Sequence, residues 1–177
     1  MTANTQIQLD PELLFPGMPD YARMWIFALE GRPTDMRSVL KHVRKYIIGW
    51  LSHGRTVTAT CALLENRFLI VSGHIPGGAL SGCSMDALTN TVQQAVESAQ
   101  CQLISPMRVL YRANDGAIHQ VPRAAFRQLI QEQMVTGDTL VFNLGLTMLR
   151  ELLAGQFERP LAKSCYARLF RVAQPAG

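Results

Sequence analysis

A thiol, two hydroxyls and a carboxylate are gathered in one short stretch, Ser81-Gly82-Cys83-Ser84-Met85-Asp86. A predicted strand and a glycine-rich loop, spanning 68–78, precede it, and the pattern predicts a helix over about 84–100. Helix starts carry unpaired N–H groups and partial positive charge. They therefore favour a bound anion and make a cysteine thiol more acidic. We expect a ligand-binding or reaction site in this stretch.

The leading interpretation is a small anionic ligand held by hydroxyls and backbone amides of the loop. The expected ligand-binding residues are Gly77, Gly78, Ser81, Gly82, Ser84, Asp86 and Asn143. Asn143 joins this set because a polar side chain at the end of a strand often faces a cleft. A purely structural alternative makes Ser84 the N-cap of the helix and places Asp86 in its first turn.

A second interpretation is a thiol-dependent enzyme. Cys83 would be the nucleophile, and His74 or His53 would be its base. The structural alternatives are that Cys83 packs as a small apolar residue and that His53 and Gly54 terminate the preceding helix. His53, His74 and Cys83 could also hold zinc. Their spacing does not require a metal, so we expect neither a metal nor another cofactor.

The hydrophobic pattern predicts an α+β fold. Strands are expected over 24–29, 56–64, 68–71 and 108–111, and helices over 34–51 and 84–100. Thr34 is the expected N-cap of the first helix. The resulting order, strand–helix–strand–strand–helix–strand, is that of a ferredoxin-like βαββαβ core.

The chain is expected to have three parts. Residues 1–20 form a loose leader, 21–112 the ferredoxin-like core, and 113–177 an α/β extension packed on the core as a single compact unit. In the extension, Asn114-Asp115-Gly116 predicts a hairpin turn. Helices are expected over 122–133 and 146–154, and strands over 118–121, 139–142 and 165–172.

The composition narrows the classes of partner. The 177 residues are 48% hydrophobic and 17% charged, which suits a packed core and predicts an exposed apolar face, such as a dimer interface. The net charge of +4 comes from scattered basic residues, so nucleic-acid binding is not expected. Four irregularly spaced cysteines and the lack of a signal peptide indicate a reducing, cytoplasmic location. No apolar stretch is long enough to span a membrane.

Four short motifs within residues 24–171 share a family likeness. They are Trp50-x-x-His53-Gly54, Gly82-Cys83-Ser84-Met85-Asp86, Thr139-Leu140-Val141-Phe142-Asn143 and Ser164-Cys165-Tyr166-Ala167-Arg168-Leu169. Together they resemble a family of small bacterial proteins often labelled "ABC transporter ATPase". The resemblance implies a shared fold and site. ATPase activity is not expected, because a P-loop requires G-x-x-x-x-G-K-[ST] and Cys83 stands where the lysine would be.

Three functions therefore remain open. The leading hypothesis is a cytosolic protein that binds a small anionic ligand or a protein partner near 77–86. The alternatives are a thiol-dependent enzyme that uses Cys83 and a scaffold or homodimer without a ligand.

Overall fold

The computed structural model describes residues 11–172 as an α+β protein with antiparallel sheets. These residues form two compact units that interleave along the sequence. The N-terminal unit contains residues 11–104 and 145–153, and the C-terminal unit contains residues 105–144 and 154–172.

Four antiparallel strands form the sheet of the N-terminal unit, in the order β4-β5-β1-β6. They are β1 (Arg23–Glu30), β4 (Thr58–Leu64), β5 (Phe68–His74) and β6 (Gln102–Leu103). The predicted hairpin is confirmed, since β4 and β5 pair without interruption from Thr58 opposite His74 to Leu64 opposite Phe68. Nearly every residue of β5 is buried, which explains its continuous apolar run, because a strand covered on both faces does not alternate.

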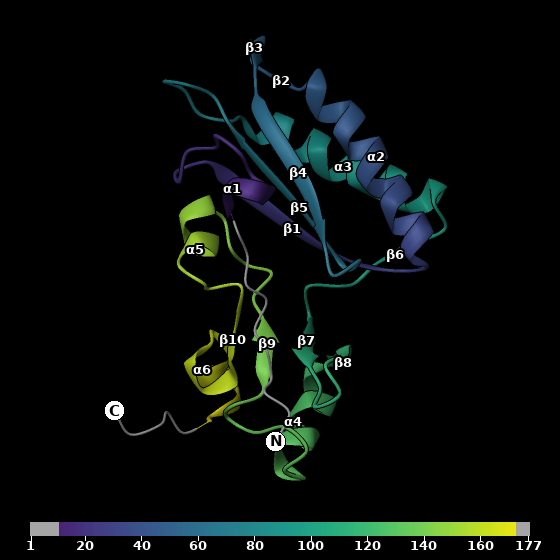
Figure 1. Ribbon diagram of the computed structural model, residues 1–177, viewed down its shortest axis with the longest axis vertical. Coiled ribbons are helices and arrows are strands. Elements are labelled where there is room, and N and C mark those ends of the chain that lie inside the picture. Colours follow the sequence, from purple (N-terminus) through teal and green to yellow (C-terminus); the bar gives the residue numbers. More distant parts are fainter. Residues whose placement is uncertain (1–10, 173–177) are drawn as a thin grey trace. The chain divides into compact units, whose positions relative to one another are not determined.

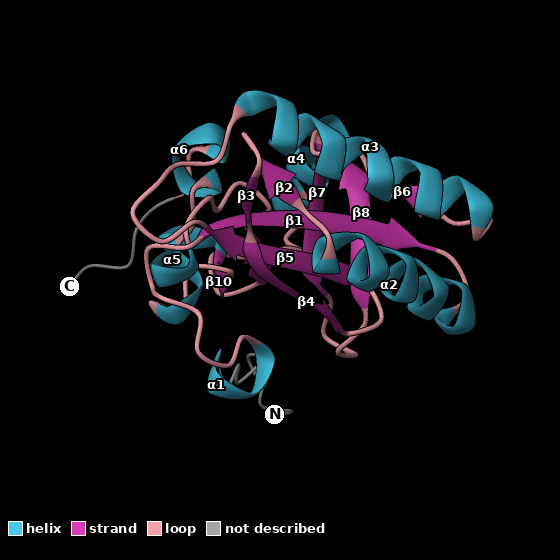
Figure 2. Cartoon of the chain, turned by 90° about the horizontal axis from the view of Figure 1, so that it is seen from above, coloured by secondary structure: helices cyan, strands magenta, loops and turns pink. Residues whose placement is uncertain are grey.

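Helices α2 (Pro33–Ile48) and α3 (Gly82–Ser98) lie side by side on one face of this sheet (Figures 1 and 2). Apolar residues at helical spacing in α2 face the sheet, which is the amphipathic pattern that the sequence predicted. The fully buried core beneath the helices includes Leu29, Val39, Val43, Trp50, Leu69, Val71, Leu88 and Val92.

The start and end of α2 differ from the prediction. Its N-cap is Arg32 rather than Thr34, because Pro33, which lacks an N–H, occupies the first position of the helix. The Arg32 guanidinium pairs with Asp35 at 2.6 Å. The helix ends at Ile48 with Gly49 as C-cap, before the predicted end at residue 51.

A two-residue turn follows α2. Strands β2 (Leu51–Ser52) and β3 (Arg55–Thr56) form a small hairpin whose turn residues are His53 and Gly54. Both turn residues have positive φ, 51° and 74°, as a tight hairpin turn with right-handed strand twist requires. The alternative in which His53 and Gly54 terminate the helix is therefore wrong.

The strand predicted over 108–111 does not complete this sheet. The fourth strand is β6, which pairs only Leu103 with Leu29 and Gln102 with Glu30. Two residues are too few to produce a recognisable hydrophobic pattern. Strand β7 (Arg108–Arg112) instead pairs with β8 and β9 in the other sheet.

The sheet of the C-terminal unit has the order β10-β9-β7-β8. After β7 come β8 (Ile118–Pro122), α4 (Arg123–Gln131), β9 (Leu140–Phe142), β10 (Glu158–Pro160), a 3₁₀ turn (Leu161–Lys163) and α6 (Tyr166–Phe170). The hairpin turn at 114–116 is confirmed, with Gly116 at φ 85°.

The strand predicted over 165–172 is wrong, because α6 occupies this segment. Tyr166 and Phe170 are four residues apart and therefore share one helix face. That face packs on the core, where the ring centroids of Phe170 and Phe126 lie 5.0 Å apart. Tertiary packing thus decides the conformation of this short aromatic segment.

A buried ion pair joins two strands of the C-terminal unit. Arg112 Nε donates a hydrogen bond of 2.6 Å to Glu158 Oε1, and Arg112 Nη1 donates to the Gly116 carbonyl. The guanidinium also lies 5.5 Å from the centre of the Phe142 ring. Both charged side chains are almost fully buried.

Two short helices differ from the prediction. Of the predicted leader over 1–20, residues 1–10 lie outside the described residues, 11–14 form α1 (Pro11–Leu14), and Phe15 is buried in the N-terminal unit. The helix predicted over 146–154 is shorter, α5 (Leu149–Leu153).

Candidate functional site

The motif at 81–86 does open a helix, but one turn earlier than the structural alternative placed it. Ser81 is the N-cap of α3, and its Oγ accepts a hydrogen bond of 3.2 Å from the Ser84 N–H. Ser84 is therefore a residue of the first turn rather than the cap. Asp86 lies beyond the first turn, which contains no acidic residue, so its predicted first-turn position is wrong.

The hydroxyls at this helix start form hydrogen bonds within the protein. Ser52 Oγ donates to Ser81 Oγ and accepts from the Ser81 N–H, at 3.1 and 2.9 Å. Ser84 Oγ donates to the Ser81 carbonyl, and the buried Trp50 indole N–H donates to the Ser84 carbonyl. These bonds fasten the start of α3 to the β2–β3 hairpin, which gives Ser81 and Ser84 a structural role.

A cavity of about 320 Å³ lies beside this helix start. Its lining comes from the segment before β1, the end of β5, the loop after β5 and the first turns of α3. The lining residues are Tyr21, Arg23, His74, Ile75, Gly78, Ala79, Leu80 and Met85. A volume of this size lies in the range of pockets that bind small organic ligands.

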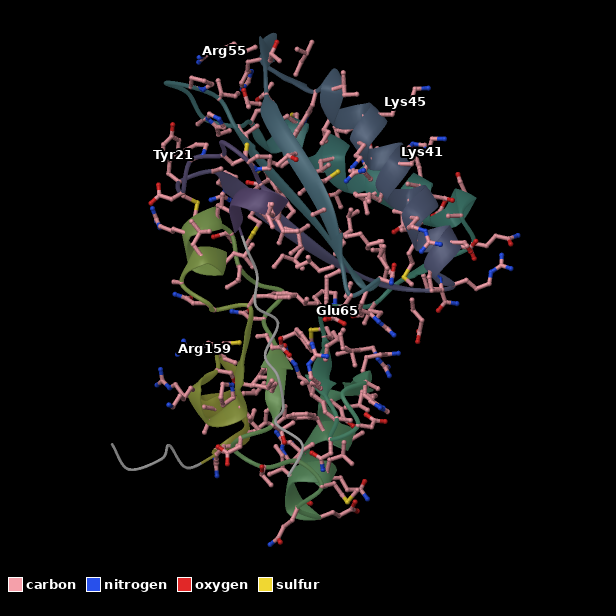
Figure 3. The ribbon with its side chains drawn as sticks, viewed as in Figure 1. Tyr21, Lys41, Lys45, Arg55, Glu65 and Arg159 are labelled. Carbon is pink, nitrogen blue, oxygen red and sulfur yellow. The ribbon has the colours of Figure 1, made fainter. Side chains whose placement is uncertain are left out.

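The strand register brings the polar groups of this cavity together. Arg23 begins β1 opposite Gly73, so the end of β5 places His74 beside it. The rings of Tyr21 and His74 meet edge to face with centroids 5.8 Å apart. Figure 3 shows Tyr21 at the periphery of the N-terminal unit, and both Tyr21 and Arg23 are exposed.

His74, which lines this cavity, carries an unusual polar atom. Its Nδ1 is buried and has no hydrogen-bond partner among the described residues. Leaving a buried nitrogen unpaired costs about 1–3 kcal/mol, so native proteins seldom tolerate it without a ligand or water partner. The Arg23 guanidinium likewise makes no hydrogen bond or ion pair within the described part of the chain.

The loop over 75–80 is held in place by Arg55. Arg55 Nη2 donates to the Pro76 carbonyl at 2.6 Å, and the Gly78 N–H donates to the Ile75 carbonyl at 3.0 Å. A Cβ at Gly78 would collide with the Arg55 guanidinium, so a larger residue there would require this flexible side chain to move. The labelled Arg55 projects from the β2–β3 hairpin in Figure 3.

The predicted catalytic residues His74, Cys83 and His53 lie in separate places. His74 lines the cavity, whereas neither Cys83 nor His53 is among its described lining residues. Cys83 is exposed in the first turn of α3, and its thiol has no hydrogen bond within the described residues. His53 is exposed in the β2–β3 turn. No group of three His, Cys, Asp or Glu side chains in residues 11–172 could hold a metal ion.

The predicted ligand-binding residues divide similarly. Gly78 contributes to the cavity, while Gly77 sits in the loop with φ 63° and Gly82 is the exposed first residue of α3. Asn143 belongs to the C-terminal unit, where it lines a separate hollow of about 100 Å³. Its neighbours in that lining include Arg159, Cys165 and Tyr166.

Sequence reasoning missed Tyr21 and Arg23. Tyr21 precedes strand β1 and Arg23 begins it, and the signal that could have found them is the antiparallel register. Once β1 pairs with β5, the residues at the start of β1 must lie beside those at the end of β5.

No family model matches the chain, and neither curated proteins nor solved structures gave a match. Among residues 11–172, no helix has the length and apolar character needed to cross a membrane.

Proposed function

We propose that this protein binds a small organic anion in the cavity between Tyr21, Arg23, His74 and the 75–80 loop. The observation that carries the proposal is that Arg23 and His74 line the same cavity, while neither the Arg23 guanidinium nor the His74 Nδ1 has a partner within residues 11–172. Arginine binds carboxylate and phosphate groups through two parallel hydrogen bonds. The expected ligand has such a group at one end and a small apolar body at the other.

The remaining lining residues of the cavity suit the apolar body of such a ligand. Ile75, Ala79, Leu80 and Met85 provide an apolar wall, and Tyr21 adds an aromatic edge. The anion is thus bound beside the predicted 81–86 motif, by residues of β1 and β5 rather than by its serines.

We also propose that the N-terminal unit has a ferredoxin-like fold. The order β4-β5-β1-β6 supports this fold, because β1 and β4 run parallel on either side of β5 in the sheet. Along the chain, α2 connects β1 to β4 through the short β2–β3 hairpin. In such a split βαβ arrangement, both helices lie on one face of the sheet. The cavity would then lie at one end of that sheet.

An NMR titration with benzoate tests the proposed function, and benzamide is the uncharged probe of the same shape. Benzoate should shift the backbone amides of 75–80 and bind at least tenfold more tightly than benzamide. Arg23→Gln should abolish that difference, because the charged partner of the carboxylate is lost. His74→Phe keeps an aromatic ring, removes both ring nitrogens and should weaken both probes.

Arg37→Gln is the matched control, since Arg37 is an exposed arginine on α2 outside the cavity lining. It should leave both affinities unchanged. Equal binding of benzoate and benzamide, or benzoate shifts confined to another region, would contradict the proposal.

A further inference from the structure

The edge of the N-terminal sheet at β4 lacks the features that normally protect such edges. Strand β4 is the terminal strand of the sheet and pairs only with β5 (Figure 2). Its sequence, Thr-Ala-Thr-Cys-Ala-Leu-Leu, contains no proline and no charged residue, and its seven-residue register has no bulge. Natural proteins usually use one of these features to prevent pairing with another chain.

The outer backbone groups of β4 are available for hydrogen bonding. From Thr58 to Leu63, no backbone N–H or carbonyl has a partner outside the β4–β5 pairing within residues 11–172. A strand of seven residues thus offers a row of donors and acceptors at alternate positions. Such an edge can receive an extended peptide as an additional strand.

A groove of about 640 Å³ runs along this edge. One side is formed by Leu13, Leu14 and Pro16 at α1, and the other by α2 residues. The lining from α2 and β4 comprises Leu40, Arg44, Ile47, Ile48 and the strand from Ala59 to Leu63. Leu13 and Ile48 are 80% and 81% exposed, which is unusual for large apolar side chains.

The charge beside the groove is positive. Arg44 is the one charged residue among the described lining residues, and the lining includes no carboxylate. Arg37 and Lys41 precede Arg44 at seven and three residues, so they continue the same helix side. Figure 3 shows Lys41 and Lys45 projecting outward from α2.

We propose that this groove binds an extended acidic segment of a partner protein, which adds to β4 as a fifth strand. Main-chain hydrogen bonds to β4 supply the affinity, and side chains at alternate positions select the partner. Apolar side chains of the segment contact Leu13, Leu40 and Ile48. Its carboxylates lie beside the basic residues of α2.

Charge also distinguishes this partner from a second copy of the chain. Symmetric pairing of two β4 edges would bring together two α2 helices, each of which packs against its own β4. Each helix carries Arg37, Lys41, Arg44 and Lys45 against the single acid Asp35. Like charges facing across an interface cost affinity, whereas an acidic segment gains from the same residues.

The test uses two nine-residue peptides, one alternating glutamate with valine and the other alternating lysine with valine. The glutamate peptide should shift the amides of 58–64 and slow hydrogen exchange at alternate residues of β4. The lysine peptide should bind at least tenfold more weakly. Arg44→Glu should weaken binding of the glutamate peptide and strengthen binding of the lysine peptide, by about tenfold each, because it changes the sign of the charge in the groove.

Lys45→Glu is the control, since Lys45 is on the same helix but outside the groove lining. It should change the affinities less than Arg44→Glu does. Equal binding of the two peptides, or glutamate-peptide shifts away from β4, would overturn the proposal. So would sedimentation showing a dimer that Ala62→Asp in β4 dissociates, because the occupant would then be a second copy of this chain.

Discussion

Removing the Ser81 hydroxyl tests whether the start of α3 is fastened as the structure indicates. The Ser81→Ala variant loses the N-cap bond to the Ser84 N–H, which is worth about 1 kcal/mol in other proteins. It also leaves the buried Ser52 hydroxyl without its acceptor, at a cost of about 1 kcal/mol. We therefore expect a loss of about 2 kcal/mol in the free energy of unfolding.

Urea unfolding followed by tryptophan fluorescence measures this loss where it occurs. Both tryptophans, Trp25 and Trp50, belong to the N-terminal unit, and Trp50 donates directly to the first turn of α3. With a typical urea dependence of about 2 kcal/mol per molar, the midpoint should fall by about 1 M with an unchanged slope.

Two further serine variants provide the controls. Ser81→Asp keeps an acceptor at the cap and should recover about half of the loss. Ser38→Ala removes an exposed hydroxyl inside α2, where it donates only to the Thr34 carbonyl, and should change stability by less than about 0.5 kcal/mol. A Ser81→Ala midpoint no lower than that of Ser38→Ala would refute the structural role of Ser81.

Two other predictions concern buried and capping carboxylates. Glu158→Leu should lower the stability of the C-terminal unit by about 3–5 kcal/mol, since it removes the carboxylate that pairs with the buried Arg112 guanidinium. The double variant Arg112→Met/Glu158→Leu should lose less. Hydrogen exchange in β7 and β9 measures both losses, and additive losses would contradict the prediction. Hydrogen bonds from the Thr147 and Met148 N–H groups lower the pKa of Glu151 below its ordinary value of 4.5. The ionised Glu151 carboxylate should therefore stabilise the folded state above that value, and this stabilisation should disappear as the pH falls through the lowered pKa. Thermal unfolding should therefore separate Glu151→Gln from wild type at pH 7 and bring them together in acid, and a constant difference would refute this role.

The sequence predicted the strongly periodic elements of the N-terminal unit well. The buried strand at 24–29, the amphipathic helix after it, the 58–74 hairpin and the helix after the glycine loop all have clear patterns. The elements that were predicted wrongly are short or have a conformation decided by tertiary contacts. Strand β6 has two residues, and α6 is helical because Phe170 packs against Phe126.

The candidate site was located by sequence only in part. The glycine loop and His74 do border a cavity, but Ser81 and Ser84 bond within the protein, and Arg23 comes from a strand that begins 51 residues before His74. A local motif cannot reveal such a partner, since strand pairing alone brings it close.

The interleaving of the two units affects how the chain is completed during synthesis. Residues 145–153 belong to the N-terminal unit, where the Leu149 N–H bonds to the Ala22 carbonyl and the Arg150 N–H bonds to the Asp20 carbonyl. The ribosome must therefore release most of the second unit before the first can acquire its final helix. Until then, the apolar surface that Leu149 and Leu152 later cover stays open to chaperones.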